Sequence, residues 1–388
     1  MSPARRIAVP LGAVVGLVLV AGCTGGDAPD ATGEPATVEQ SPAPESADPD
    51  PTSTSASATV TPTETEPPPD PGPRVVTTGL EAPWSVAFVG GTPLVSERDS
   101  ARILELSDDG AAREVGVVAG VQTAGEGGLL GLAVDDDDRL YVYSTGDDGN
   151  RVQRYDLQGD PGSYDLGDPT TILEGIPAAR SHDGGRLAFG PDGMLYASTG
   201  DARVRGSAQD RGSLAGKILR MTPDGDVPDD NPFDDSLVYS YGHRNVQGLA
   251  WADDGTMFAT EFGQDTWDEL NVITPGANYG WPEVEGITGD SGEYTDPVQQ
   301  WSPDEASPSG MAAIGGALYV ANLRGAVLRS VPVDDPTTST DLFTGYGRLR
   351  DAVESPDGEL WFLTNATDGR GEPGPDDDRI VAVAVPAD

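Results

Sequence analysis

The stretch Arg186-Leu-Ala-Phe-Gly-Pro-Asp-Gly-Met-Leu-Tyr196 carries the pattern that decides the fold of this 388-residue chain. Two short apolar runs are joined by a Gly-Pro-Asp-Gly turn, and such runs around an Asp-Gly turn predict a β-hairpin. Counted with this stretch, the pattern occurs at residues 84–96, 128–143, 186–196, 248–258, 310–320 and 350–362. Sustained helical periodicity is absent from this part of the chain, so we expect an all-β domain.

The six hairpins recur at intervals of roughly 40 to 60 residues, close to the length of a four-stranded propeller blade. Six copies therefore predict a six-bladed β-propeller with four-stranded blades over residues 74–388. A β-sandwich, the competing layout, does not need the same hairpin six times. Radial repetition protects the strand edges and leaves a central mouth lined by loops, where we expect a ligand to bind.

The N-terminus indicates export. Arg5 and Arg6 precede an apolar run over residues 8–21, which is shorter than the roughly 20 residues that span a bilayer comfortably. The run ends in Val-Ala-Gly before Cys23, the only cysteine, and resembles a bacterial lipoprotein signal. Residues 1–23 are therefore interpreted as a signal peptide, with a lipid on Cys23 that anchors an extracytoplasmic protein to the outer face of the cell membrane. A single cysteine also excludes a disulfide framework.

Residues 24–73 contain mainly Pro, Ser, Thr, Ala, Asp and Glu. Such a composition buries too little apolar surface to offset chain entropy, so we expect a disordered tether. The whole chain has a formal net charge of −42 and a single lysine, Lys217. This acidity argues against a nucleic acid as partner, because the phosphate backbone would be repelled.

Histidine is the side chain that exchanges a proton near neutral pH most readily, and the chain has only two, His182 and His243. They are the leading candidates for acid–base chemistry. Other chemistries lack their signatures: no dinucleotide fingerprint opens a helix, no Cys/His spacing suits zinc, and no Gly-x-Ser-x-Gly elbow occurs with a histidine in the right order.

Several motifs are more specific than a propeller requires. They are residues 125–132, the stretch from Ser181 to Asp201, and residues 241–250, 261–271, 278–282, 321–324 and 347–351. In this order on a six-bladed pattern they resemble the soluble pyrroloquinoline quinone (PQQ) dependent sugar dehydrogenases, also called aldose sugar dehydrogenases. The resemblance covers nearly the whole domain.

The resemblance implies that PQQ, which carries three carboxylates, binds at the mouth. Its contacts would come from a glutamate, an asparagine and four arginines: Glu126, Arg244, Asn245, Arg324, Arg348 and Arg350. Arginine suits carboxylates because its planar fork binds them bidentately. Arg324 stands where the family commonly has lysine, and Glu126 where several members have glutamine. A carboxylate beside an anionic cofactor is unfavourable unless an arginine or calcium offsets it.

The same resemblance implies two calcium ions. The backbone carbonyls of Gly263 and Gln264 would hold the one that also contacts the quinone, although the family usually has proline where Gln264 stands. The Glu269 carboxylate and the Tyr279 carbonyl would hold the second. Carboxylate and carbonyl oxygens are the ligands that calcium selects.

The implied reaction is hydride transfer from C1 of an aldose to the C5 carbon of the quinone, with a lactone as product and a further, unidentified electron acceptor. His182 would remove the C1 hydroxyl proton and Asp201 would orient His182, while Arg244 and calcium polarise the C5 carbonyl. His243 is interpreted as structural. Two alternatives stay open: a calcium-dependent lactonase on a propeller, and a non-catalytic cell-surface propeller that binds sugar or protein.

Overall fold

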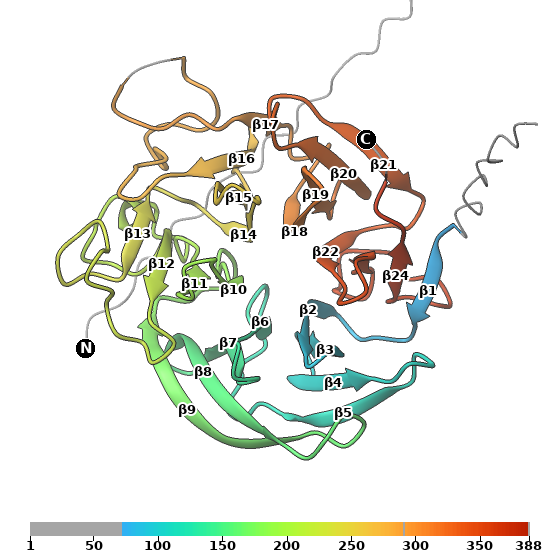
Figure 1. Ribbon diagram of the computed structural model, residues 1–388. Coiled ribbons are helices and arrows are strands. Elements are labelled where there is room, and N and C mark those ends of the chain that lie inside the picture. The colour runs from blue at the N-terminus through green and yellow to red at the C-terminus, as the bar shows by residue number, and fades with distance from the viewer. Residues whose placement is uncertain (1–71, 290–291, 387–388) are drawn as a thin grey trace, which may run out of the picture. The chain divides into compact units, whose positions relative to one another are not determined.

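The structure is a computed structural model that describes residues 72–289 and 292–386. Within these ranges, four-stranded antiparallel sheets form the six blades of a ring around a central axis (Figure 1). The prediction of an all-β, six-bladed propeller with four-stranded blades is confirmed. The signal at residues 1–23, with Cys23, and residues 24–71 of the tether lie outside the described residues. No helix in the described ranges is long and apolar enough to cross a membrane.

In every blade but the last, four strands follow one another in the chain from the axis outward. Blades one to three contain β2 (Pro83–Val89), β3 (Thr92–Glu97), β4 (Arg102–Leu106), β5 (Ala112–Val117), β6 (Leu129–Val134), β7 (Leu140–Gly146), β8 (Gly149–Gln158), β9 (Asp165–Ile176), β10 (Leu187–Phe189), β11 (Leu195–Ser198), β12 (Lys217–Met221) and β13 (Val238–Tyr241).

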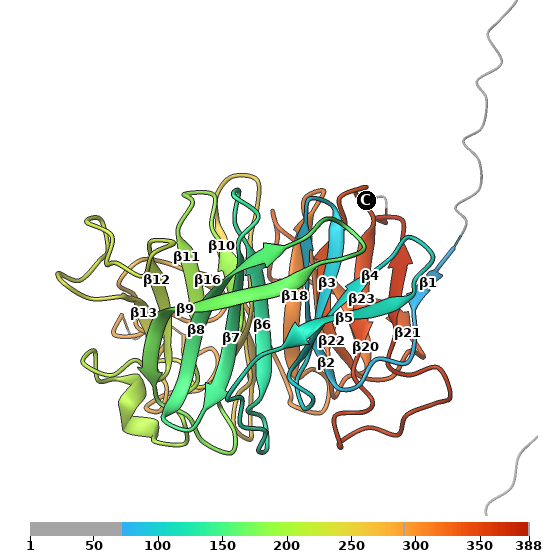
Figure 2. The same cartoon turned by 90° about the horizontal axis from the view of Figure 1, so that it is seen from below.

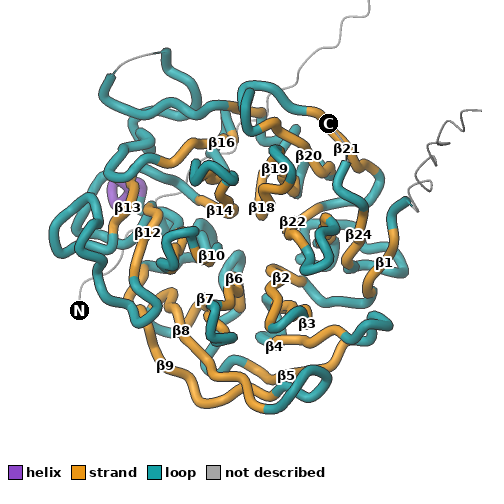
Figure 3. Tube along the Cα trace, in the orientation of Figure 1, coloured by secondary structure: helices purple, strands orange, loops and turns teal. Residues whose placement is uncertain are grey.

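Blades four to six contain β14 (Val246–Trp251), β15 (Met257–Glu261), β16 (Asp268–Ile273), β17 (Gln299–Trp301), β18 (Pro308–Ile314), β19 (Ala317–Asn322), β20 (Val327–Pro332), β21 (Thr340–Thr344), β22 (Leu349–Glu354), β23 (Leu360–Thr364), β24 (Ile380–Val383) and β1 (Arg74–Thr77). The described residues hold one helical element, the 3-10 helix η1 (Arg205–Ala208), which Figure 3 shows against the background of strands and loops.

The six predicted hairpins are the two innermost strands of the six blades. In blade three, Leu187 pairs with Ala197 and Phe189 with Leu195. The turn between these strands is closed by backbone hydrogen bonds from Gly193 N to Gly190 O at 2.9 Å and from Gly190 N to Met194 O at 3.0 Å. The local turn chemistry therefore forms the hairpin that the sequence pattern predicts.

The ring is closed by the two ends of the domain. β1 pairs antiparallel with β24, with Arg74 opposite Ala382, and so forms the outer strand of the sixth blade. Seen edge-on, β1 lies at the periphery beside the strands of that blade (Figure 2). This pairing leaves the first and last blades joined by backbone hydrogen bonds rather than by side-chain packing alone.

The hydrophobic core is distributed between the blades. Six clusters of buried apolar side chains lie in the described residues, and each draws mainly on two neighbouring blades. The cluster between blades three and four, for example, contains Tyr196 and Ile218 from one blade and Val246 and Leu249 from the next. Each blade is thus held by the apolar faces of both neighbours.

A buried ion pair crosses the axis of the ring. The Nη1 atom of Arg186, just before β10, donates to Asp351 Oδ2 in β22 at 2.9 Å and so joins blades three and six. The Nε atom of Arg186 donates to Gln247 O at 3.0 Å, and its guanidinium lies 4.4 Å from the centroid of the Trp84 ring. Burial raises the pKa of Asp351, although Arg186 partly offsets this effect.

Removal of one partner of this pair is expected to destabilise the propeller strongly. Arg186→Met leaves the Asp351 carboxylate buried without its cation, which costs about 3 to 5 kcal/mol in comparable pairs. The midpoint of urea unfolding should fall accordingly. The double variant Arg186→Met/Asp351→Leu removes both charges and should recover much of the loss. Equal destabilisation of the single and double variants would contradict this account.

Candidate active site

Most of the predicted site residues lie on loops at one face of the propeller, whereas Arg350 lies in β22 and Glu269 in β16. Because neighbouring strands are antiparallel, the loop from the second to the third strand of a blade leaves from the same face as the loop to the next blade. His182 precedes β10 and Asp201 follows β11, whereas Arg244 precedes β14 and Gly263 follows β15. The fold therefore brings residues that are far apart in the sequence to a single face.

His182 and Asp201 form a direct pair. His182 Nδ1 lies 2.7 Å from Asp201 Oδ1, and the other carboxylate oxygen accepts a hydrogen bond from Trp281 Nε1 at 2.9 Å. Burial opposes the ionisation of Asp201, but the hydrogen bonds from His182 and Trp281 outweigh it and lower the pKa of Asp201. An ionised Asp201 needs a donor at Nδ1, which leaves Nε2 of neutral His182 as a proton acceptor.

The backbone of His182 is held in an unusual conformation. Its φ is 66°, in the left-handed region that non-glycine residues rarely adopt. Glu126 Oε2 accepts the His182 backbone N–H at 2.8 Å, and Arg370 Nη2 donates to Glu126 Oε1 at 3.1 Å. A Cβ on Gly200 would lie 1.9 Å from His182 O, so only glycine permits this approach. Glu126 therefore supports the histidine, and Arg370 offsets its charge.

A buried hydrogen-bond network holds the backbone of Arg244 and Asn245 in place. His243 is fully buried, with Nε2 2.8 Å from Ser240 Oγ and Nδ1 2.8 Å from Glu261 Oε2. The other oxygen of Glu261 accepts the backbone N–H of Arg244 and, at 3.3 Å, that of Asn245. These contacts agree with the structural role that the sequence analysis gives to His243.

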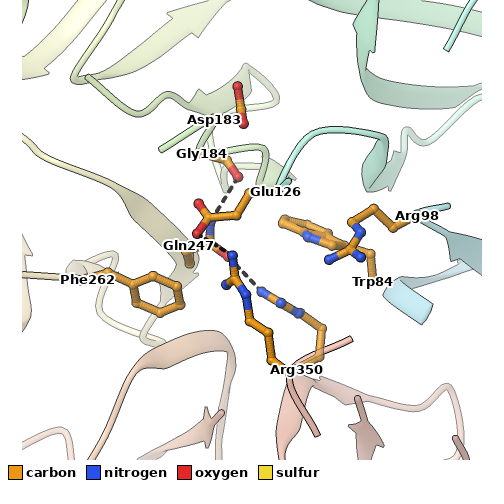
Figure 4. A pocket seen from close by; sticks show the side chains of 9 residues that line it. Trp84, Arg98, Glu126, Asp183, Gly184, Gln247, Phe262 and Arg350 are labelled. Atoms are coloured by element: carbon orange, nitrogen blue, oxygen red, sulfur yellow. Dashed lines mark hydrogen bonds and ion pairs between the residues drawn. The ribbon is translucent and has the colours of Figure 1, made fainter. Parts of the chain in front are cut away.

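Arg348 and Arg350 approach the same carboxylate. Arg348 Nη2 donates to Asp368 Oδ2 at 3.0 Å, and Arg350 Nη2 lies 4.0 Å from the same atom. Arg350 Nη1 donates to Gln247 Oε1 at 2.9 Å (Figure 4). Burial lowers the pKa of Arg350 to about 9. The guanidinium is therefore held where its charge is poorly solvated.

Four donors among the predicted quinone contacts have no hydrogen-bond partner in the part of the chain that the structure describes. They are Arg244 Nε, Asn245 Nδ2, Arg348 Nε and Arg350 Nε, and all four atoms are buried. A buried donor without an acceptor lowers the free energy of unfolding, so such groups are rare in folded proteins. Arg324 differs: its side chain is 60% exposed, pairs with Asp304 at 2.5 Å, and lines neither of the two pockets at this face.

The pocket next to His182 has a volume of about 300 Å³ and is lined by His182, Asp201, Arg203, Arg205, Arg244, Gln264, Asp265 and Trp281. A narrower pocket beside it contains Glu126 and Arg350, with Trp84, Arg98, Asp183, Gly184, Gln247, Phe262 and Arg370 (Figure 4). Arg244 Nη1 donates to Phe262 O at 2.9 Å and so links the two pockets. The predicted base, its aspartate and Arg244 thus share one cavity.

The predicted calcium ligands divide between two places. Gly263 and Gln264 lie in the loop after β15, where Gln264 lines the pocket of His182. Glu269 is buried and accepts hydrogen bonds from Gly286 N at 2.7 Å and Asn271 Nδ2 at 3.1 Å. Tyr279 is buried, and its ring stacks on the His243 ring with 4.6 Å between the two centroids. No cluster of three or more His, Cys, Asp or Glu side chains suited to a metal occurs in the described ranges.

Trp281 and Lys217 matter to the site although the sequence analysis gave them no role. Trp281 donates a hydrogen bond to Asp201, and the guanidinium of Arg244 lies 5.5 Å from the centroid of its ring. Buried Lys217 donates to Ser207 O at 2.7 Å, Ala208 O at 3.0 Å and Ala215 O at 2.6 Å, which fixes η1. A single lysine in so acidic a chain was the signal available for Lys217. For Trp281 it was membership of the motif at residues 278–282.

The comparison with protein families agrees with this geometry. The model of the family described as glucose/sorbosone dehydrogenase matches residues 80–372. The chain belongs to the glucose/sorbosone dehydrogenase family. The matched range contains every residue of the site described above, from Glu126 to Arg370.

Three members with known identities are similar to this chain. The structure of a PQQ-bound aldose sugar dehydrogenase from Streptomyces coelicolor is 51% identical, covers 80% of this chain and 96% of its own, and superposes with a TM-score of 0.76. An aldose sugar dehydrogenase of Escherichia coli is 30% identical over 76% of this chain and 90% of its own. Quinoprotein glucose dehydrogenase B of Acinetobacter calcoaceticus is 30% identical over 56% and 54%.

Lys217 is expected to make stability depend on pH. Burial lowers the pKa of Lys217 to about 8, against an ordinary value of 10.5. Between these values the unfolded chain keeps a proton that the folded protein has released, so stability rises with pH from about 8 to 10.5. Below about 8 both states are protonated and the cost of the buried charge is constant. The slope is at most about 1.4 kcal/mol per pH unit.

The measurement is the free energy of unfolding at about pH 7.5 and about pH 9.5 for the wild type and Lys217→Met. We expect the wild type to gain stability relative to the variant at the higher pH, because methionine does not titrate. Other groups titrate in both proteins and cancel in the difference. An unchanged difference between the two proteins would refute the lowered pKa.

Proposed function

We propose that this family member is a PQQ- and calcium-dependent dehydrogenase that oxidises the C1 hydroxyl of aldose sugars to lactones. The observation that carries the proposal is the His182–Asp201 pair in one cavity with Arg244, next to buried donors that lack acceptors. The names of the relatives, an aldose sugar dehydrogenase bound to PQQ and a quinoprotein glucose dehydrogenase, support the cofactor and the substrate class.

The residues at the mouth fit an anionic, planar cofactor. Arg244, Arg348 and Arg350 each carry a buried Nε without an acceptor, and Asn245 carries a buried Nδ2 without one. Carboxylate and quinone oxygens are the acceptors that these donors lack. The contact of Glu126 with PQQ that the resemblance implies stays a prediction. Glu126 also accepts hydrogen bonds from His182 N and Arg370 Nη2. It supports the site through those bonds.

The chain's own residues account for the proton and for the position of the sugar. His182 Nε2 takes the proton of the C1 hydroxyl, and ionised Asp201 stabilises the imidazolium that forms. Trp281 keeps Asp201 oriented through its Nε1–H. Arg244 provides fixed positive charge where negative charge develops. Bound PQQ supplies the redox couple, since it accepts the C1 hydrogen as hydride.

Calcium fits the donor set of the same loops. The carbonyl oxygens of Gly263 and Gln264 are the hard ligands that calcium prefers, and Gln264 lines the cavity. Burial, together with the nearby charge of Glu261, raises the pKa of Glu269 to about 8. A cation held by Glu269 and the Tyr279 carbonyl would stabilise the ionised form of the Glu269 carboxylate. A calcium ion held by these residues would supply Lewis acidity and would stiffen the loop.

The proposed location follows from the N-terminus. With a lipid on Cys23 and residues 24–73 as a tether, the propeller would work outside the cell membrane. It would oxidise sugars there and pass the electrons to an acceptor that is not identified. Detergent partitioning of the full chain, compared with a Cys23→Ser variant, tests the anchor.

His182→Ala should abolish most sugar oxidation but retain the fold and the binding of PQQ. Loss of a general base typically lowers turnover by ~10²- to 10⁴-fold. Because His182 has a positive φ, His182→Asn is the matched variant: asparagine tolerates that backbone conformation better than alanine. Dye reduction with an aldose, a PQQ absorbance titration and a melting curve are measured on all three proteins. Near-normal turnover in either variant excludes His182 as the base.

Arg348→Ala combined with Arg350→Ala should weaken PQQ binding far more than stability. Each charge-assisted hydrogen bond lost costs about 1.5 to 3 kcal/mol of binding, so a loss of at least about 100-fold in affinity is expected. The variant also carries Asp368→Asn, because the buried Asp368 carboxylate would otherwise lose both of its cations and lower stability. Arg324→Ala is the comparison, since its side chain is exposed and paired with Asp304. Arg324→Ala should lose less PQQ affinity than the combined variant. A large drop in melting temperature with unchanged affinity contradicts the proposal.

The two alternatives predict different results with the same preparation. After addition of PQQ and calcium, reduction of a dye by aldoses supports the dehydrogenase. Opening of a sugar lactone without PQQ would instead support a calcium-dependent lactonase. A non-catalytic propeller would show neither reaction.

A further inference from the structure

The described arginines differ sharply in whether they have an acidic partner. Most lie within 4.0 Å of a carboxylate, as a chain with 65 Asp and Glu residues leads one to expect. Those without such an ion pair in the described ranges are Arg151, Arg180, Arg203, Arg205, Arg211 and Arg244. Three of them, Arg203, Arg205 and Arg244, line the cavity of His182.

Arg203 and Arg205 have no role in the proposed binding of the quinone. Arg203 lies beside the predicted base: its backbone N–H donates to Asp201 Oδ1 at 2.7 Å, and its Nη1 donates to Ser181 Oγ at 3.0 Å. The guanidinium of Arg205 lies 5.1 Å from the centroid of the Trp281 ring and donates to the Gln264 side chain. Both side chains are exposed to the cavity and to solvent.

The carboxylates of the cavity do not neutralise these two arginines. Asp201 is already engaged by His182, Trp281 and the Arg203 backbone. Asp265 is exposed and accepts from Gln264 Nε2 at 2.9 Å, without an ion pair to either arginine. The cavity therefore contains two positively charged guanidinium groups that the binding of a neutral sugar does not require. Arginine forks match carboxylate and phosphate groups.

The segment that carries the two arginines is fixed rather than free. Lys217 binds the carbonyls of Ser207 and Ala208, both within η1, and the hydrogen bond between Asp201 and His182 anchors the beginning of the segment. A backbone held in this way loses little conformational entropy when the segment binds a ligand. The arrangement is that of a built subsite.

We propose that the sugar oxidised at this site carries an anionic group, a carboxylate or a phosphate, and that Arg203 and Arg205 bind it. This inference rests on the proposed function. With a uronic acid, the C1 hydroxyl faces His182 Nε2 and the carboxylate faces the arginines. The hydroxyl proton goes to His182 and the C1 hydrogen leaves with two electrons as hydride to PQQ. The C1–O bond becomes a carbonyl, and the product is a lactone that keeps its carboxylate.

The test is anaerobic single-turnover reduction of the PQQ- and calcium-loaded enzyme by matched sugars, so that no electron acceptor takes part. Glucuronic acid and glucose 6-phosphate are compared with glucose, and galacturonic acid with galactose. We expect at least about a tenfold advantage in apparent second-order rate constant for the preferred anionic sugar, and a decline of this advantage with added salt. The uronic and phosphorylated arms distinguish the two anions.

The double variant Arg203→Gln/Arg205→Gln should reduce the ratio of anionic to neutral rate constants by about tenfold or more. Arg211→Gln is the matched control: Arg211 belongs to the same loop and forms no ion pair, but it packs over Phe233 in a different pocket. Its ratio should equal that of the wild type. Calorimetric binding of methyl glucuronide, which cannot be oxidised because its C1 oxygen is blocked, should show the same dependence on the two arginines.

The outcomes separate this inference from the proposed function. Reduction by glucose with no advantage for any anionic sugar overturns the inference and leaves the dehydrogenase proposal intact. A ratio unchanged in the double variant overturns it equally. If the variant alters only the oxidation of the reduced enzyme by an anionic dye, the arginines serve an electron acceptor and the inference is wrong. Failure of every sugar to reduce the enzyme refutes the proposed function itself.

Discussion

Positive charge buried without enough acceptors is the constraint on which the site depends. Arg350 is buried and its pKa is lowered to about 9 by that burial, yet its Nε has no partner among the described residues. Arg244 and Arg348 leave the same atom unsatisfied. Folding alone does not favour such an arrangement, since each orphaned donor carries a desolvation cost. A rigid frame must hold the groups in place until a ligand brings the acceptors.

The propeller provides that frame because no blade can move alone. Each blade packs on both neighbours, β1 ties the first residues of the domain to β24, and Arg186 joins Asp351 across the axis. Residues at the mouth come from loops of different blades, so their separation is set by the ring rather than by the loops. A displacement of Arg350 would break its bond to Gln247 in blade four. Rigidity of the ring thus preserves the unsatisfied charge.

The innermost hairpins were predictable because their turn chemistry is local. In blade three, for example, Gly190 and Gly193 close the turn by backbone hydrogen bonds within a short stretch of sequence. The outer strands were not, since β9, for instance, is largely exposed and lacks an apolar pattern. Pairing of Arg74 with Ala382 leaves no local signal. In the site, the His182–Asp201 pair was anticipated through motifs. The bonds of Glu126 to His182 and of Trp281 to Asp201 each join two blades and therefore required the three-dimensional arrangement.

The global charge of the chain and the local charge of the site lead to different conclusions about partners. A net charge of −42 describes the potential at long range and argues against nucleic acid. At the mouth, however, the carboxylates of Glu126 and Asp201 beside His182, and that of Asp368 beside Arg348, each accept hydrogen bonds from fixed donors. Their charge is therefore offset locally, whereas several guanidinium donors remain unmatched. Salt screens the distant acids far more than these buried contacts, so the local sign governs what binds.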